Sequence, residues 1–291
     1  MDHVALDWMT DLVLAALACD APVDAPALTF LLRRYRQTNR SDLREALEQA
    51  LALAVEPQAS GESSSDHAAW LTLLAEAAAL SDDERIRGAA AELIDRLRRD
   101  WGRAGVVETA MSGVDACLTC RHLVELPTLV PDAIDELERV VADAYSPGDG
   151  LMSRVHEPSG LRGRLADHVR ASSALLTAFD VTGRLPYSML AEELMGWGKR
   201  MLWDEDAAAF RESRLDPRHP FALNCEAARV FCRLAILHSQ EEYRSAAVLA
   251  SDADYAGDAT RILSTQDKAY QRHGLTSAVY GLALIEWVGL P

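Results

Sequence analysis

The chain has 291 residues, 49% of them hydrophobic, and is therefore long enough to bury a large core. Its 29 basic and 45 acidic side chains give a formal net charge of −16. No cluster of Lys and Arg occurs, which excludes nucleic acid and an anionic membrane surface as expected partners, because both are bound by concentrated positive charge.

The sequence also predicts a cytoplasmic protein. No run of about 18 uncharged apolar residues is present, so no membrane-spanning helix is expected. The chain starts on an acidic segment, and Asp7 and Asp11 interrupt its first apolar stretch, which does not resemble a signal peptide. The five cysteines are an odd number and do not suggest a disulfide framework.

In chain order, the first predicted helix covers residues 3–18 and has no preceding partner. A helix pair follows, 26–38 with 41–54. The next pair is the clearest: its first helix, 68–80, has one charged residue in thirteen, and its second, 83–100, has ten in eighteen. A helix that is apolar all round is buried, whereas a half-charged helix has one face in water. The first is therefore predicted to be an inner helix and the second an outer one.

The same alternation continues to the end of the chain. Three further pairs are predicted: 114–126 with 130–145, 165–182 with 186–202, and 221–238 with 241–250, the last followed by a short helix near Asp258. Residues 274–288 form an apolar helix without a following partner. Packed against helix 3–18, it supplies a sixth pair and closes a ring. We therefore predict a single all-α domain over residues 1–291, an (α/α)6 toroid.

The predicted connections differ on the two faces of the ring. Inner-to-outer turns are short, such as Asn39-Arg40 and Ser81-Asp82. Outer-to-inner connections are long: 55–65, 101–113, 146–164 and 204–220. Some are expected to hold short hairpins, and 151–156 followed by 157–160 is typical of a strand and a turn. Because long ordered loops usually carry function, we expect the main cavity on this face.

Three short motifs resemble known toroids. The first combines Asp66-His67-Ala68, an apolar helix and Ser81-Asp82-Asp83. It resembles the repeat of N-acylglucosamine 2-epimerase-like proteins and, more closely, the toroid region of bacterial thioredoxin-domain-containing proteins related to the spermatogenesis-associated protein. That family has Tyr-Asp-Asn-Ala, a helix, then Thr-Gly-Asp, so Asp66 matches and His67 departs.

The other two motifs lie in the second half of the chain. Leu165-Ala166-Asp167-His168 resembles the family's Leu-Asp-Asp-Tyr, in which only Leu165 and Asp167 match. The segment from Asn224 to Ala228 resembles the family's Asn-x-x-Ala-Ala block. The resemblance is clearest from residue 150 onward, and no segment reads as the family's thioredoxin module. It implies the toroid fold and a sugar-processing role.

Polar residues gather where the inner helices are predicted to begin, and in the ring these starts converge on one mouth. Paired carboxylates and imidazoles there suit hydrolysis or epimerisation of a sugar, which needs one group to give a proton and another to take one. The alternative is structural, because Asp and Asn are preferred helix N-caps. The predicted catalytic residues are Asp115, Asp167, His168 and Glu226. The predicted substrate-binding residues are Asp66, His67, Trp70, Asn224 and His273.

His168 carries the most specific prediction. We expect Asp167 to cap its helix and His168 to face the cavity within reach of Glu226 or Asp115. A neighbouring carboxylate raises the pKa of an imidazole and makes a proton-transfer pair. If His168 instead packs between helices, it is structural.

The remaining candidates favour structural roles. Trp8 and Trp70 could stack on a sugar, but Trp is usually core. Cys117 and Cys120 lie inside a predicted helix without two further metal ligands, and Cys225 and Cys232 share one helical face. His122, His219 and His238 are expected on the surface or in loops. No nucleotide-binding or metalloprotease motif occurs, so neither cofactor nor metal is predicted.

Two functions follow from this sequence. The first is a carbohydrate-active enzyme, a sugar epimerase or a glycoside hydrolase, with a sugar as its ligand. The second is a non-catalytic toroid that binds a ligand or a protein partner. The departures at His67 and Ala166 favour the second, whereas the convergence of polar groups favours the first. A terpenoid cyclase ring is disfavoured because the Asp-rich motifs of those enzymes are missing.

Overall fold

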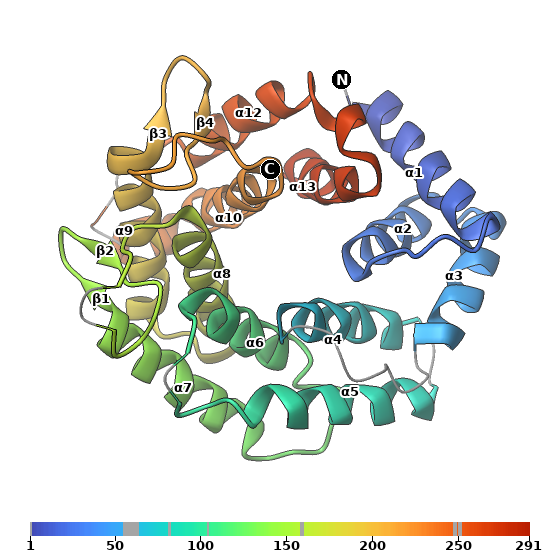
Figure 1. The fold of residues 1–291 in the computed structure, drawn as a ribbon, viewed down its shortest axis with the longest axis horizontal. Coiled ribbons are helices and arrows are strands. Elements are labelled where there is room, and N and C mark those ends of the chain that lie inside the picture. The colour runs from blue at the N-terminus through green and yellow to red at the C-terminus, as the bar shows by residue number, and fades with distance from the viewer. Residues whose placement is uncertain are drawn as a thin grey trace.

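The computed structural model describes residues 2–54, 64–80, 83–103, 105–157, 160–246, 249 and 252–291. In this part of the chain the helices form two concentric layers around a central axis (Figure 1). The inner layer consists of α2 (Ala25–Thr38), α4 (Ser64–Ala78), α6 (Val107–Thr119), α8 (Leu165–Thr182), α10 (Phe221–Ser239) and α13 (Ala278–Val288). The outer layer consists of α1 (Asp2–Ala18), α3 (Ser41–Ala54), α5 (Glu84–Arg98), α7 (Leu129–Ala144), α9 (Leu185–Leu202) and α12 (Tyr255–Gln266).

The burial of each helix follows its composition. α5 buries only one stripe, which includes Ile86, Ala90 and Ile94, and turns its charged side to water. α8 is buried along most of its length. Side-chain N-caps occur on both inner and outer helices. Asp24 accepts a hydrogen bond from the Ala27 N–H at the start of α2, and Asp83 accepts one from the Arg85 N–H at the start of α5. Inner and outer helices are therefore distinguished as predicted.

The ring closes between the first and last helices of the chain. Each inner helix contacts the next, and α13 contacts both α2 and α1. A Cβ atom on Gly281 would lie 2.5 Å from Phe30 and 3.1 Å from Met9, so α13 approaches both neighbours too closely for a side chain there. The predicted (α/α)6 toroid and its closure by α1 and α13 are confirmed.

The bounds of three predicted helices were wrong. α6 covers Val107–Thr119 instead of 114–126. Gly113 was predicted to be the last residue of the preceding connection, but it is part of the helix. It lies inside the helix, where a Cβ atom would be 3.4 Å from Leu97. α12 is a full outer helix and not a short one. The last inner segment divides into η1 (Tyr270–Ser277) and α13, with Gly274 in a non-helical conformation (φ 53°).

The predicted hairpins are present in the long connections. β1 (Tyr145–Ser146) pairs with β2 (Gly150–Leu151), and β3 (Trp203–Asp204) pairs with β4 (Ala209–Phe210), both antiparallel. Of the predicted strand 151–156, only residue 151 lies in a strand, while Met152 and Arg154 form isolated bridges with Arg162 and Val106. Residues 81–82, most of 55–65 and residues 158–159 lie outside the described part. The short helix α11 (Glu241–Ala246) precedes α12.

Among the described residues, no helix is both long and apolar enough to cross a membrane.

Candidate functional site

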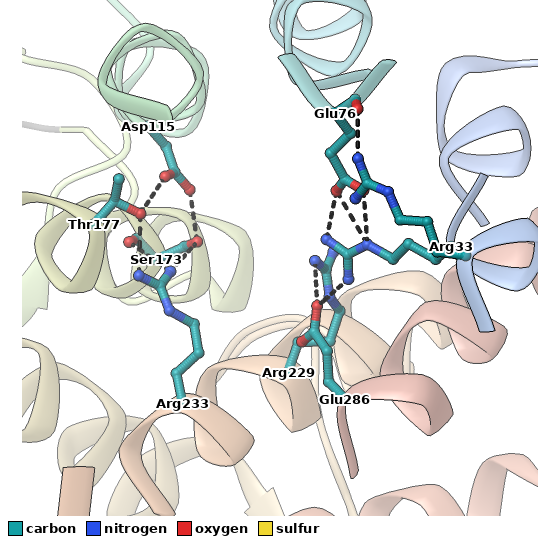
Figure 2. Close-up of polar contacts among 9 residues, drawn as sticks. Arg33, Glu76, Asp115, Ser173, Thr177, Arg229, Arg233 and Glu286 are labelled. Carbon is teal, nitrogen blue, oxygen red and sulfur yellow. Dashed lines mark hydrogen bonds and ion pairs between the residues drawn. The ribbon is translucent and has the colours of Figure 1, made fainter. Parts of the chain in front are cut away.

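Figure 2 shows a group of charged and hydroxyl side chains from all six inner helices, which form two clusters of polar contacts. We call this group the central network. It consists of Arg33, Arg36, Glu76, Asp115, Ser173, Thr177, Arg229, Arg233 and Glu286. Two inner segments are almost free of charge: Glu76 is the single charged residue of the stretch 68–80, and Glu286 is the single charged residue of α13. Such isolated charges are a sequence signal for this site, and of the residues in the central network only Asp115 was predicted.

One half of the central network spans the seam of the ring. Arg33 on α2 contacts Glu76 on α4 at 2.7 Å and Glu286 on α13 at 2.5 Å, and Arg229 on α10 also contacts Glu286 at 2.7 Å. Burial acts to raise the pKa of Glu286, but the guanidinium groups of Arg229 and Arg33 outweigh it and hold that pKa below its ordinary value. Glu286 is therefore held as a carboxylate between two cations.

The other half joins α6, α8 and α10. Asp115 accepts hydrogen bonds from the hydroxyls of Ser173 and Thr177, both at 2.6 Å. Arg233 donates to the Thr177 hydroxyl at 3.1 Å and to the Asp180 carboxylate at 2.9 Å. The two hydroxyls thus lie between the Asp115 carboxylate and the Arg233 guanidinium (Figure 2).

A further ion pair extends the central network toward the helix starts. Arg170 and Glu226 lie one turn before Ser173 and Arg229 on the same helix faces, and they contact each other at 2.8 Å. Arg170 Nε, Glu226 Oε2 and Glu286 Oε2 are buried and have no hydrogen-bond partner. Because these three atoms have no partner, each can form one more hydrogen bond. An unpaired buried polar atom costs about 1–3 kcal/mol.

Asp167 lies at the mouth of the ring but is enclosed. It is fully buried and accepts a hydrogen bond from the Ser153 hydroxyl at 2.6 Å. Burial raises its pKa to about 6, although Ser153 and the nearby charge of Arg164 act to lower it. Arg164 in turn contacts Glu212 at 2.9 Å and Glu108 at 3.7 Å, two mouth carboxylates that the sequence analysis did not select.

The prediction for His168 was wrong. Its ring is 1% exposed and stacks on Trp197 of the outer helix α9, with centroids 4.4 Å apart. Nδ1–H donates to the Arg164 carbonyl at 2.8 Å, and Nε2 accepts the Leu151 N–H at 3.3 Å, so both ring nitrogens are used. Burial lowers its pKa to about 4. The helix turns this side chain toward α9 and away from Glu226 and Asp115, so the imidazole is a neutral packing group.

Asn224 is also structural, which differs from its predicted substrate-binding position. It is fully buried. Its amide accepts from the Phe210 N–H at 2.7 Å and donates to the Phe210 carbonyl at 3.0 Å, so it holds hairpin β3–β4 against α10. A side chain that pairs both groups of one backbone residue has little left for a ligand.

The remaining predicted residues are spread around the ring. Asp66 lies in the first turn of α4, and its charge adds to the burial that raises the pKa of Asp24. His67 is half-buried on the same turn, and Trp70 packs partly against the core. His273 is exposed in η1, where it stacks on Phe221 with centroids 3.8 Å apart. Of the predicted catalytic residues, only Asp115 and Glu226 join the same polar surface.

Among the residues expected to be structural, the cysteines are placed as predicted and His238 is not. Cys117, Cys120, Cys225 and Cys232 are buried, and burial raises the pKa of Cys120 to about 12. His238 was expected at the surface, but its Nε2 lies 2.8 Å from Glu192, a carboxylate that is 3% exposed. Within the described residues, no group of three or more His, Cys, Asp or Glu side chains has the geometry to hold a metal ion.

Two cavities open beside outer-to-inner connections, on the face predicted for the main cavity. One, about 400 Å³, lies between the start of α1 and residues 267–272. The other, about 210 Å³, lies between α5, α6 and α7. Neither contains a residue that was predicted to be catalytic or substrate-binding.

No family model matches the sequence, and no curated protein matches it either. Solved structures do resemble it. A possible member of the GH105 family from Klebsiella pneumoniae has a TM-score of 0.75 at 10% identity, over 99% of this chain and 94% of that one. The unsaturated glucuronyl hydrolase of Bacillus sp. GL1 has a TM-score of 0.70 at 13% identity, over 90% and 85%.

The GH76A alpha-1,6-mannanase of a Salegentibacter species has a TM-score of 0.60 at 10% identity, over 90% of this chain and 87% of that one. All three likenesses extend over most of both chains. At identities this low the likeness shows the fold alone, which is the (α/α)6 toroid architecture.

Proposed function

We propose that this protein is a carbohydrate-active toroid that binds a saccharide at the central network and acts on it as a glycoside hydrolase does. The fold is shared with structures described as a mannanase and as unsaturated glucuronyl hydrolases, and one of them was solved with alpha-1,6-mannotetrose. A fold hosts many activities, so the proposal depends on the side chains at the ring centre.

The observation that carries the proposal is the group of charged and hydroxyl side chains from all six inner helices, within and beside which Arg170 Nε, Glu226 Oε2 and Glu286 Oε2 have no hydrogen-bond partner. These three atoms belong to three inner helices, and they include both donor and acceptor capacity. A sugar hydroxyl can donate to a carboxylate and accept from a guanidinium at once. A polyhydroxylated ligand therefore matches this mixture better than an apolar one.

Glu226 and Asp115 are the proposed acid–base residues. Hydrolysis of a glycosidic bond uses two carboxyl groups, one to protonate the leaving oxygen and one to assist the attack on the sugar. Glu226 is neutralised by Arg170, and Asp115 is held by two hydroxyls, so the two carboxyls have different surroundings. Different surroundings are what separate the roles of such a pair.

Two alternatives remain proposals. The resemblance to N-acylglucosamine 2-epimerase-like and thioredoxin-domain-containing proteins suggests epimerisation, although His168 and His273 lie in separate settings. A non-catalytic binding toroid is favoured by a specific observation. Glu76, Glu286, Glu226 and Asp115 already have guanidinium or hydroxyl partners. Asp167, His168 and Asn224 are buried and hydrogen-bonded to other parts of the protein. A cytoplasmic location stays a proposal of the sequence.

The test is binding and turnover of three saccharides: alpha-1,6-mannotetraose, an unsaturated glucuronyl disaccharide and N-acetylglucosamine. Calorimetry measures binding, and chromatography of the reaction measures cleavage or epimerisation. We expect Glu226→Gln to reduce turnover at least tenfold, about 1.4 kcal/mol, while Glu242→Gln on the exposed helix α11 changes nothing. Binding without turnover in the wild type would establish the non-catalytic alternative, and failure to bind any of the three would overturn the proposal.

A further inference from the structure

The cavity of about 210 Å³ lies in the wall of the ring, on the outer side of α6. α6 presents Asp115 to the central network, whereas its residues Ala110 and Gly113 line this cavity. The cavity and the proposed sugar site are therefore separate surfaces of one helix. We call it the outer-wall cavity.

The floor of the outer-wall cavity is apolar and buried. Leu97 of α5, Val140 of α7 and Val155 of the following connection are at most 4% exposed, and Gly113 contributes no side chain. Trp101 lines the cavity and is only half-buried. An apolar floor next to an accessible aromatic ring is typical of a small-molecule site.

The charged groups at its rim already have partners. Arg139 contacts Glu136 at 2.7 Å and Asp143 at 3.2 Å, and Arg103 has a weaker contact with Asp100 at 4.0 Å. The positive charges of these arginines are balanced by the negative charges of the carboxylates. A charged ligand would have to displace an existing ion pair, so the rim favours a neutral one.

We propose that the outer-wall cavity binds a small, uncharged aromatic molecule with one substituted ring. Its size supports this class, because an engineered cavity of about 150 Å³ lined by apolar side chains binds benzene. The half-buried Trp101 offers a ring for edge or offset contact with the ligand. The inference does not depend on the sugar-binding function.

Calorimetry with p-cresol and indole as probes tests the site. Ala110→Leu places three more carbon atoms in the cavity, and we expect it to weaken p-cresol binding about tenfold or more. Ala46→Leu, at a half-buried position of α3 in another part of the wall, is the matched control and should leave the affinity unchanged. If wild-type protein binds neither probe at millimolar concentration, or if both variants behave like the wild type, the proposal is wrong.

A second variant covers the case in which Ala110→Leu does not fold. Val140→Ala enlarges the cavity, so it should shift the preference from p-cresol toward the larger 2-naphthol. An unchanged ratio of the two affinities would overturn the assignment. Saccharide binding by the same variants reports separately on the ring centre, and it should remain at the wild-type level.

Discussion

At the scale of single residues, Asp167 and His168 are neighbours in sequence with opposite responses to pH. Burial raises the pKa of Asp167 to about 6, so its contribution to stability is complete below its ordinary pKa of 3.8 and is lost as the pH rises through 6. Burial lowers the pKa of His168 to about 4, so its contribution is complete above 6.5 and is lost as the pH falls toward 4. Between pH 4 and 6 the two effects oppose each other.

Single substitutions should reveal how each of the two residues changes the free energy of unfolding with pH. Asp167→Asn keeps an acceptor for the Ser153 hydroxyl and removes the buried charge, so it should stabilise the protein by about 1–3 kcal/mol near pH 7.5 and by much less near pH 4.5. His168→Gln should destabilise the protein less at pH 4.5 than at pH 7.5. At pH 4.5 the wild type is itself destabilised by protonation of the buried imidazole, and the variant is not. Urea unfolding at both pH values measures the two effects. Equal effects of Asp167→Asn at both values would show that the carboxyl is not desolvated.

At the scale of elements, the connection between α7 and α8 is anchored on Trp197. The indole Nε1–H donates to the Gly148 carbonyl at 2.9 Å, and the His168 ring stacks on the indole. Gly163 has φ 73°, and a Cβ atom there would lie 2.4 Å from Trp197. Gly148 has φ 88° but nothing within 4 Å. The two glycines share a left-handed backbone and differ in the space around them.

This difference predicts two distinct costs. Gly148→Ala should destabilise by about 1 kcal/mol, the cost of a side chain at positive φ. Gly163→Ala should destabilise by roughly 2–4 kcal/mol, because the indole must also move. Chemical denaturation gives both values, and near-ultraviolet circular dichroism should change for Gly163→Ala alone. Similar losses for the two variants would mean that the connection does not pack tightly on Trp197.

At the scale of the whole molecule, α1 completes the wall behind α13. Met9 and Phe30 enclose Gly281, Trp8 packs edge-on against Tyr270 at 5.3 Å, and Asp7 pairs with Arg34 at 2.7 Å. Inside the ring, Arg33 and Glu286 connect the first and last inner helices across 253 residues of sequence. Ring closure therefore combines apolar packing outside with an ion pair inside.

Removal of residues 1–18 should destabilise the entire ring, because it exposes the apolar faces of α13 and α2. We expect a lower and less cooperative thermal transition, and partial recovery when a peptide of residues 1–20 is added. A scrambled peptide of the same composition is the control. A truncated protein that melts cooperatively at the wild-type temperature would show that the ring does not need α1.

The sequence alone determined the alternation of inner and outer helices and the closure of the ring. The reason is local: an apolar helix must be buried and a half-charged one must face water, so the order of compositions sets the order of layers. The tertiary structure decided where the side chains point. On a helix that is buried nearly all round, a register change of one residue rotates a side chain by about 100°, and composition does not fix that rotation. His168 therefore faces Trp197 on α9, and Asp115, which was expected at the mouth, lies in the second half of α6. Arg33 and Glu286 are 253 residues apart in the sequence, so they can pair only once the ring has closed.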